Sequence, residues 1–373
     1  MQKLCRIMTI DSSLESLIKG QLKFLSDYYE VIAIADDSGK LDSVAVNEGV
    51  RTIGVPMRRE ISILSDLNSL RLLIKVFRKE RPYIVHANTP KGSLLSMVAA
   101  WITKVPHRIY LVTGLRFETT TGFLRILLKF MERVTCLCAT KVIPEGEGVK
   151  NLLIRERITR KPLHKILNGN INGIDLNYFV RNEDVVIRSK CLQSDKFTFI
   201  YIGRIVKDKG VNELIRSFDR LSKQRDNVRL LLVGAFENNV NPIEEYTRKI
   251  IDTNPSIEYA GYQTDVRPYL AASNVLVLPS YREGFPNVII QAGAMDLPCI
   301  VTDINGCNEV VINGKNGIIV PKQNEEALYQ AMLTYLEDME QYKNHASNSR
   351  DLIVNRYDQK ELWAALLKMY NSL

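Results

Sequence analysis

Short apolar runs rich in valine, isoleucine and leucine alternate with amphipathic segments of helical period from one end of this chain to the other. A strand that reads as a continuous apolar run is buried on both faces, as in a parallel sheet covered by crossover helices. The alternation therefore predicts an α/β protein. With 373 residues, the chain is long enough for two domains, since a domain usually takes about 100–200 residues.

The predicted elements form two series, each with the order of a Rossmann-like, doubly wound unit. The first series has strands over 4–10, 29–35, 83–87 and 108–112, and helices near 14–26, 66–80, 92–103 and 122–138. The second has strands over 197–202, 228–233, 257–259, 275–278 and 299–302, and helices over 211–224, 243–253, 265–272 and 287–295. A polar, charged segment over 177–195 separates the two series and is predicted to be a linker.

Three helices close the chain, over about 325–339, 341–354 and 358–371. They need an apolar surface to cover, and the last is long enough to reach the first domain. We therefore expect domains over 1–180 and 190–355, with residues 356–373 forming a helix that returns to the first domain.

Positive charge is concentrated in the first half of the chain. Residues 1–190 hold 30 lysines and arginines against 19 acidic residues, whereas residues 191–373 hold 20 against 23. Within the first half, residues 51–165 carry 22 basic and 8 acidic residues. Such an excess attracts nucleic acid, an anionic membrane or a phosphorylated substrate, although a merely solvated basic face has the same composition.

The cysteines are scattered over the whole length instead of clustering at ligand spacing. We therefore expect reduced thiols, with neither a disulfide framework nor a metal site. The apolar run before Asp11 is too short for a signal peptide, and no stretch reaches the roughly 18 apolar residues of a spanning helix. The protein is expected to be cytoplasmic.

Ligands of open α/β sheets bind beyond the carboxyl ends of the strands, where loops present backbone N–H groups. The strand over 197–202 runs into a loop that begins at Gly203 and ends at Gly210, with cations at Arg204 and Lys209. Glycines let the backbone approach a ligand, Arg204 can hold two phosphate oxygens, and Lys209 adds a point charge. This loop is predicted to bind a diphosphate, the alternative being a turn with solvated cations.

A second candidate loop, 279–287, lies between the strand over 275–278 and a helix. Its Gly-Phe-Pro-Asn step leaves the amides of the first helical turn free for an anion. Glu283 precedes this positive end, where its carboxylate can accept hydrogen bonds from sugar hydroxyls or simply stabilise the helix start. Gln291, eight residues after Glu283 and on the helix that follows this loop, can present an amide to another hydroxyl of the same ligand.

These two loops, together with two later motifs, resemble the retaining glycosyltransferases of family four. The matching motifs in the second half are 203–210, 280–288, 302–309 and 313–317. In the first half, the segments 85–92, 114–118 and 172–175 are similar to the subgroup that builds bacterial capsular and other surface polysaccharides and lipid-linked oligosaccharides. The resemblance covers nearly the whole chain. It implies the GT-B fold, in which two Rossmann-like domains face across a cleft, the first binding the acceptor and the second the nucleotide sugar.

The resemblance also implies residue roles. Arg204 and Lys209 would act on the donor diphosphate and Glu283 on donor-sugar hydroxyls, and these three are the predicted catalytic residues. The predicted donor-binding residues are Gly203, Arg204, Lys209, Tyr262, Glu283, Gly284, Phe285, Asn287, Val288 and Gln291. The predicted acceptor-side residues are His86, Asn88, Lys91, Arg116 and Glu118.

Two of these positions depart from the family pattern. Gln291 stands where relatives have a second glutamate; an amide still bonds a hydroxyl, so activity is expected to survive. Asn88 stands where relatives often have a histidine, which weakens the case for a direct catalytic role there. His86 has a structural alternative, that of a core histidine.

The implied reaction moves a hexose or N-acetylhexosamine from a UDP-sugar co-substrate to a polyprenyl-diphosphate-linked saccharide, with the anomeric configuration retained. The departing diphosphate gains negative charge that the enzyme must stabilise. The chain contains no Asp-x-Asp motif. Arg204, Lys209 and the helix start at Asn287 are therefore expected to replace a divalent ion, and no cofactor is expected.

Three other functions were weighed against this one. A dehydrogenase needs Gly-x-Gly-x-x-Gly after the first strand, and residues 10–14 contain no glycine. A nucleic-acid-binding protein would have aromatics interleaved with cations, and residues 51–165 have few, so no nucleic-acid partner is expected. A sugar-nucleotide epimerase of the same two-domain plan stays open.

The basic first domain also suggests peripheral attachment to the inner face of the cytoplasmic membrane. Around the helix at 66–80 lie Arg58, Arg59, Arg71, Lys75, Arg78, Lys79 and Arg81. On the helix at 122–138, Arg125, Lys129 and Arg133 share one face beside several apolar residues. Such a helix suits an anionic membrane surface, although a core-facing helix with a solvated basic edge has the same pattern.

Overall fold

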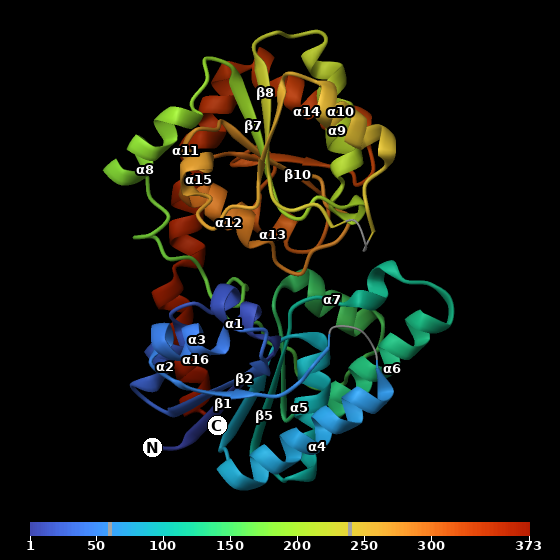
Figure 1. Cartoon of the computed structure of the whole chain (residues 1–373), viewed down its shortest axis with the longest axis vertical. Helices are drawn as coiled ribbons and strands as arrows, with labels where there is room; N and C mark the ends of the chain where they lie inside the picture. Colours follow the sequence, from blue (N-terminus) through green and yellow to red (C-terminus); the bar gives the residue numbers. More distant parts are fainter. Residues whose placement is uncertain (59–61, 238–240) are drawn as a thin grey trace. The chain divides into compact units, whose positions relative to one another are not determined.

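The structure is a computed structural model that describes residues 1–58, 62–237 and 241–373. The chain divides into two compact units: residues 1–173 together with 359–373, and residues 174–358 (Figure 1). Each unit contains a six-stranded sheet. All strand pairs within these two sheets are parallel, which confirms the predicted α/β class.

The sheet of the first unit has the order β3-β2-β1-β4-β5-β6. Its strands are β1 (Lys3–Ile10), β2 (Glu30–Asp36), β3 (Arg51–Gly54), β4 (Ile84–Ala87), β5 (His107–Val112) and β6 (Lys141–Pro144). Its helices are α1 (Asp11–Leu17), α2 (Gln21–Ser26), α3 (Leu41–Glu48), α4 (Ile63–Glu80), α5 (Pro90–Ile102), the 3₁₀ helix η1 (Arg116–Thr119), α6 (Gly122–Cys138), α7 (Glu147–Arg155) and α16 (Gln359–Asn371).

Two strands and two α-helices of this unit were absent from the sequence prediction: β3, β6, α3 and α7. They are short, and the outer strand β3 is only partly buried, so their apolar pattern is weak. The helix predicted over 14–26 is two helices, α1 and α2, because Gly20 between them has a φ of +79°. A left-handed residue breaks an α-helix.

Two apolar layers cover the two faces of the first sheet. On one face, α4, α5 and α6 pack through residues such as Phe77 and Leu128, and α5 contacts both α4 and α6 (Figure 1). On the other face, α1, α2 and α3 pack together with α16, whose Leu366 and Tyr370 are 2% exposed. The last helix thus belongs to the core of the first unit.

The sheet of the second unit has the order β12-β11-β10-β7-β8-β9. Its strands are β7 (Phe197–Ile202), β8 (Val228–Val233), β9 (Ile257–Gly261), β10 (Val275–Leu278), β11 (Cys299–Thr302) and β12 (Gly317–Val320). Its helices are α8 (Glu183–Ser189), η2 (Lys190–Leu192), η3 (Lys207–Lys209), α9 (Val211–Ser222), α10 (Glu245–Thr253), α11 (Arg267–Ala271), α12 (Asn287–Ala294), α13 (Cys307–Val310), α14 (Glu325–Glu337) and α15 (Met339–Tyr357).

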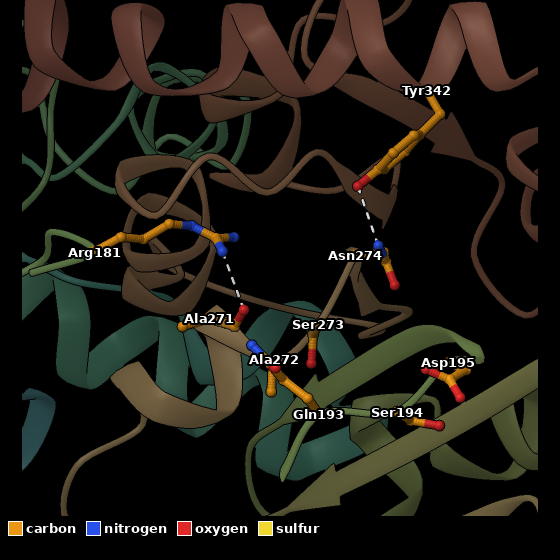
Figure 2. Close-up of a pocket in the computed structure, with 9 residues that line it drawn as sticks. All are labelled: Arg181, Gln193, Ser194, Asp195, Ala271, Ala272, Ser273, Asn274 and Tyr342. Atoms are coloured by element: carbon orange, nitrogen blue, oxygen red, sulfur yellow. Dashed lines mark hydrogen bonds between the residues drawn. The ribbon is translucent and has the colours of Figure 1, made fainter. Parts of the chain in front are cut away.

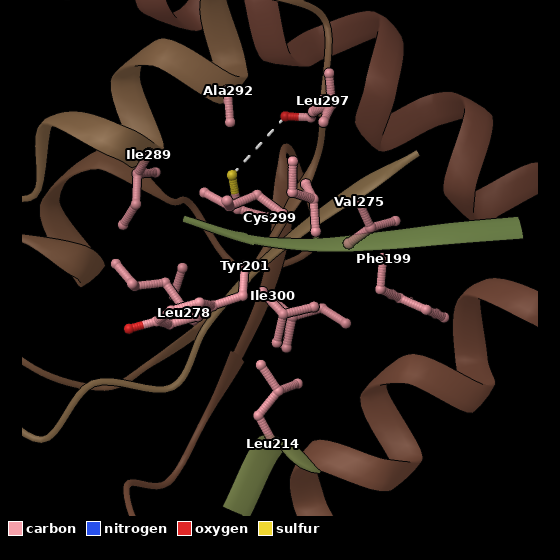
Figure 3. Packing of buried hydrophobic residues seen from close by; sticks show 14 of the residues in the cluster. Phe199, Tyr201, Leu214, Val275, Leu278, Ile289, Ala292, Leu297, Cys299 and Ile300 are labelled. Carbon is pink, nitrogen blue, oxygen red and sulfur yellow. Dashed lines mark hydrogen bonds between the residues drawn. The ribbon is translucent and has the colours of Figure 1, made fainter. Parts of the chain in front are cut away.

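The core of the second unit lies between its helices and central strands. Phe199 of β7, Val275 of β10 and Ile300 of β11 are fully buried, between Leu214 of α9 and Ala292 of α12 (Figure 3). Residues 177–195, which we expected to be a linker, are folded into this unit instead. They contain α8, whose Val185 is completely buried in the same core.

Both sheets reverse their strand order at one place, between β1 and β4 in the first unit and between β7 and β10 in the second. In doubly wound sheets, ligands bind beyond the carboxyl ends of the two strands at such a switch point. The strand order therefore marks one candidate position in each unit. No helix within the described ranges is both long and apolar enough to cross a membrane.

Candidate active site

The two predicted donor loops meet at the switch point of the second unit. Because β7 and β10 are parallel neighbours, the loops that follow them leave the sheet at the same edge. The Tyr281 amide donates a hydrogen bond to the Asp208 carbonyl at 2.9 Å, and the Ser280 hydroxyl contacts the same carbonyl at 3.4 Å. Segments about 70 residues apart in the chain thus form one surface.

Two glycines make this close packing possible. Gly210 has a φ of +70°, and a Cβ there would lie 2.0 Å from the Pro279 carbonyl oxygen. Gly306, in the loop after β11, has a φ of +77°, and its Cβ would lie 2.5 Å from the Gly284 oxygen. Any side chain at either position would push the loop at 279–286 away, since real Cβ atoms do not approach so closely.

Lys209 and Glu283, two of the predicted catalytic residues, form an ion pair. The Lys209 Nζ lies 2.5 Å from Glu283 Oε1, and the side chains are 18% and 14% exposed. Water screens such a half-buried pair only partly. A lysine ammonium carries several N–H donors, so Lys209 can hold a phosphate oxygen while Glu283 fixes its position.

Arg204, the third predicted catalytic residue, pairs with a different acid. Its Nη1 donates to Glu237 Oε2 at 2.7 Å, while its side chain stays 46% exposed. The Tyr201 hydroxyl donates to the Arg204 carbonyl at 2.7 Å and holds the backbone in place. Glu237 follows β8, the neighbour of β7, and was missed by the sequence analysis. Its position shortly after that strand is the sequence signal that could have identified it.

The remaining donor candidates lie around these loops with different exposures. Phe285 is 7% exposed and packs against Tyr357, with ring centroids 5.6 Å apart, so its side chain belongs to the core. Asn287, Val288 and Gln291 are half-buried on α12. Tyr262, just after β9, is 72% exposed. Gly203 and Gly284 lie in the two loops themselves.

The acceptor-side candidates lie in the first unit. His86 is completely buried, and its Nδ1 lies 2.5 Å from the Tyr370 hydroxyl of α16. Burial, with the positive charge of Arg6 as the smaller cause, holds the pKa of His86 well below its usual value. The burial of His86 agrees with the structural alternative given for it from the sequence, a core histidine. Asn88, just after β4, is 1% exposed, and its side-chain amide has no hydrogen-bond partner within the described residues.

Lys91, Arg116 and Glu118 follow the strands next to the first switch point. Lys91, at the start of α5, is 9% exposed and pairs with Asp66 of α4 at 2.8 Å. Arg116 and Glu118 are exposed on η1. Asp66 was not singled out in the sequence, because its partner is distant in the chain.

The basic stripe predicted on α6 does not face solvent freely, which corrects the interpretation made from the sequence. Arg125 and Lys129 both pair with Glu156, at 2.8 and 2.6 Å. Arg133 donates to the backbone carbonyls of Glu156 and Arg157. The stripe therefore holds the segment after α7 against α6.

One polar pocket of the second unit lies away from the two loops. It has a volume of about 470 Å³ and is lined by Arg181, residues 193–195, residues 271–274 and Tyr342 (Figure 2). Asn274 and Asp195 precede β10 and β7, so this pocket is at the amino edge of the sheet. Arg181 is bonded to the Ala271 carbonyl and Asn274 to Tyr342. It is therefore not a candidate for the donor site.

Comparisons with known proteins agree with the motifs. The family described as "Glycosyl transferases group 1" matches residues 196–338, and the "Glycosyl transferase 4-like domain" matches residues 26–169. The capsular polysaccharide biosynthesis glycosyltransferase CapM of Staphylococcus aureus is 35% identical over 373 residues, covering 100% of this chain and 97% of CapM.

A second relative and a solved structure extend this similarity. The UDP-Gal:alpha-D-GlcNAc-diphosphoundecaprenol alpha-1,3-galactosyltransferase of Escherichia coli is 27% identical over 341 residues, covering 89% of this chain and 86% of its own. The crystal structure of Anabaena HepE in complex with UDP and glucose has a TM-score of 0.84 at 17% identity, with all of both chains covered. At that identity, the likeness concerns the fold.

Proposed function

Since this chain belongs to the group 1, family four glycosyltransferases and has their GT-B fold, we propose that it transfers a hexose or N-acetylhexosamine from a UDP-sugar to a polyprenyl-diphosphate-linked saccharide. The transfer would retain the anomeric configuration and serve the synthesis of a surface polysaccharide. The acceptor class is taken from the Escherichia coli relative, whose name specifies a GlcNAc-diphosphoundecaprenol. The alternatives, an epimerase and a nucleic-acid-binding protein, have no support among the relatives.

The observation that carries the proposal is the Lys209–Glu283 pair at the joined loops. It puts a cation, suited to a leaving diphosphate, within hydrogen-bond distance of a carboxylate, suited to sugar hydroxyls. A nucleotide sugar presents these two chemical groups side by side, because its sugar is attached to the terminal phosphate. In this assignment Lys209, Arg204 and the start of α12 stabilise the charge that develops on the diphosphate.

The proposed activity is tested by incubating the full chain with UDP-sugars and a synthetic N-acetylglucosaminyl-diphospho-polyprenol, followed by mass spectrometry of the lipid. We expect the lipid mass to rise by one sugar residue with at least one donor. Nuclear magnetic resonance of the product should show an α-linkage from an α-linked donor. Interconversion of nucleotide sugars without any acceptor product would instead establish the epimerase.

We further propose that the first unit binds an anionic membrane through the outer sides of α4 and α6. On α6, Phe123, Ile126 and Phe130 are 79%, 66% and 59% exposed, and helical spacing places them on one side. On α4, Leu64 and Leu67 are 84% and 58% exposed.

The cations for this surface are those of α4. The exposed cations of α4 are Arg71, Lys75, Arg78 and Lys79. None of them forms an ion pair in the part of the chain that the structure describes. Arg59, also noted in the sequence, lies outside that part. Each cation near an anionic leaflet adds about 1 kcal/mol of binding free energy.

Membrane binding is tested by sedimenting the protein with vesicles of phosphatidylcholine, with and without phosphatidylglycerol. We expect binding to rise with the anionic fraction and to fall with salt. The double variants Arg71→Glu/Lys75→Glu and Phe123→Ser/Ile126→Ser should each weaken it about tenfold or more, whereas the exposed control Tyr246→Ser in the second unit should not. Equal binding to neutral and anionic vesicles would contradict the proposal.

A further inference from the structure

A small cavity lies inside the first unit, between α5, η1 and α6. Its apolar lining includes Leu94 of α5 and Leu128 and Met131 of α6. Its polar lining includes Lys91, Arg116 and Glu132. Lys91 and Arg116 are two of the residues that the family resemblance places on the acceptor side. The cavity therefore adjoins the predicted acceptor-binding region.

The size of the cavity restricts what can occupy it. Its volume of about 40 Å³ is about three times the 10–15 Å³ that one water needs, which suits a compact group of about three or four heavy atoms. Because most of the lining is apolar, water alone would be poorly held. The occupant should combine an apolar end with a hydrogen-bonding end.

Glu132 supplies the hydrogen-bonding end of the cavity. It is 8% exposed, and its Oε2 accepts a hydrogen bond from the Tyr110 hydroxyl at 2.8 Å. The Tyr110 bond fixes the carboxyl group while its second oxygen can accept from a ligand N–H. Nothing in the proposed transfer mechanism uses this buried carboxyl group.

We infer that this cavity recognises the acetamido group of an N-acetylated acceptor sugar, with the methyl group against Leu94, Leu128 and Met131 and the N–H donating to Glu132. The inference rests on the proposed function and names the chemistry of its acceptor. An acetamido group has four heavy atoms, which match the volume of the cavity. Its methyl group matches the apolar lining, and its N–H donor matches the Glu132 carboxyl group. A hydroxyl at the same ring position would leave the apolar wall unfilled.

The kinetic test compares two acceptors that differ only in this group, N-acetylglucosaminyl- and glucosyl-diphospho-polyprenol with the same short chain. We expect kcat/KM to favour the N-acetylated acceptor by about 10–200-fold, the usual worth of a filled apolar pocket. Leu94→Trp fills the cavity and should bring this ratio close to one. Val98→Trp, one turn further along α5, half-buried and outside the lining, should keep the native ratio.

A binding test without turnover separates this inference from the proposed function. In protein labelled with ¹³C at methionine methyls, N-acetylglucosamine 1-phosphate should shift the Met131 signal, whereas glucose 1-phosphate should not. Met97, buried in the same unit but outside the lining, serves as the control.

Each result has a definite meaning. Equal kcat/KM for the two acceptors, or an unmoved Met131 signal at saturating sugar phosphate, overturns the inference. A shifted Met131 signal in a protein that transfers sugar to no lipid-linked acceptor would overturn the proposed function and leave the cavity assignment standing.

Discussion

The Lys209–Glu283 pair shows how two residues acquire a joint role. Each side chain alone is an ordinary surface charge of a loop. Held 2.5 Å apart at the edge of the sheet and mostly shielded from water, they keep each other oriented before a ligand arrives. Orientation fixed in advance is what makes electrostatic stabilisation of a transition state effective.

We predict that Lys209→Ala and Glu283→Gln each lower kcat by about 10²–10³-fold, because each removes a contact to charge that develops in the transition state. The matched control is Lys207→Ala, an exposed cation on the same turn, which should stay within about twofold of the native rate. Thermal unfolding shows whether the fold is retained. Near-native turnover in both site variants would refute the assignment.

A second prediction concerns the buried carboxyl group of Glu132. Burial raises its pKa to about 7, although the hydrogen bond from Tyr110 opposes this. In the unfolded chain the group titrates near 4.5. Between these values the folded state binds more protons, so this group's contribution to stability is present below the unfolded pKa and is lost as the pH rises towards 7.

Glu132→Gln should therefore be more stable than the native protein at pH 8, by roughly 3 kcal/mol, and equal to it near pH 4. Urea unfolding at the two pH values measures the difference. Glu156→Gln is the control, since that partly buried acid is paired with Arg125 and Lys129 and its pKa is lowered instead. A difference between Glu132→Gln and the native protein that does not change with pH would contradict the raised pKa.

At the scale of elements, the proposed donor site depends on loops packing backbone against backbone. We predict that Gly210→Ala destabilises the second unit by about 3 kcal/mol or more and lowers kcat, because the new Cβ meets the Pro279 oxygen. Gly314→Ala is a matched control with a similar φ of +75° but nothing within 4 Å.

Gly314→Ala should cost only the left-handed strain of about 1–2 kcal/mol. Urea unfolding and initial rates of both variants measure the comparison. Equal destabilisation by the two substitutions would mean that the contact with Pro279 does not matter.

The helix α6 illustrates what an amphipathic pattern leaves open. Its period correctly predicts a helix with Arg125 and Lys129 on one face. The same pattern is compatible with cations that face solvent and with cations that form ion pairs. Glu156 decides between them, because it lies close to both cations only after α7 has packed. The exposed side of α6 is consequently its apolar stripe.

At the scale of the whole molecule, the chain crosses twice between its units, and α16 completes the core of the first. Leu366→Ala should destabilise that unit by about 2–5 kcal/mol. Both tryptophans, Trp101 and Trp363, belong to it, so tryptophan fluorescence follows its unfolding separately.

We expect Leu366→Ala to lower the fluorescence midpoint by about 2–4 °C per kcal/mol. Leu328→Ala in the core of the second unit should instead shift a transition seen by circular dichroism. A fluorescence midpoint unchanged by Leu366→Ala would show that α16 does not support the first unit.

Metal independence is a prediction for the complete enzyme. The absence of Asp-x-Asp from the sequence and the cations Arg204 and Lys209 at the donor loops suggest that the protein stabilises the diphosphate with its own charges. Transfer in excess EDTA should proceed within about twofold of the untreated rate. Loss of activity, restored by Mg²⁺ or Mn²⁺, would contradict this expectation.

The local features of this protein could be predicted from its residues alone: the α/β class, most strands and helices, and the two glycine-containing loops after β7 and β10. Apolar periodicity and turn residues are local signals, so they can be read along the chain. The resemblance of four motifs in the second half and three in the first to a known family extended this prediction to the GT-B fold.

The contacts between distant side chains, in contrast, depend on how the elements pack in three dimensions. The pairing of Lys209 with Glu283 follows from the strand order, which makes β7 and β10 neighbours. The hydrogen bond between buried His86 and Tyr370 and the ion pair between Arg125 of α6 and Glu156 likewise join residues that are distant in the chain. Charge pairing and burial are properties of three-dimensional proximity, which a periodic pattern does not encode, and for that reason the partners of these residues had to be seen in the folded protein.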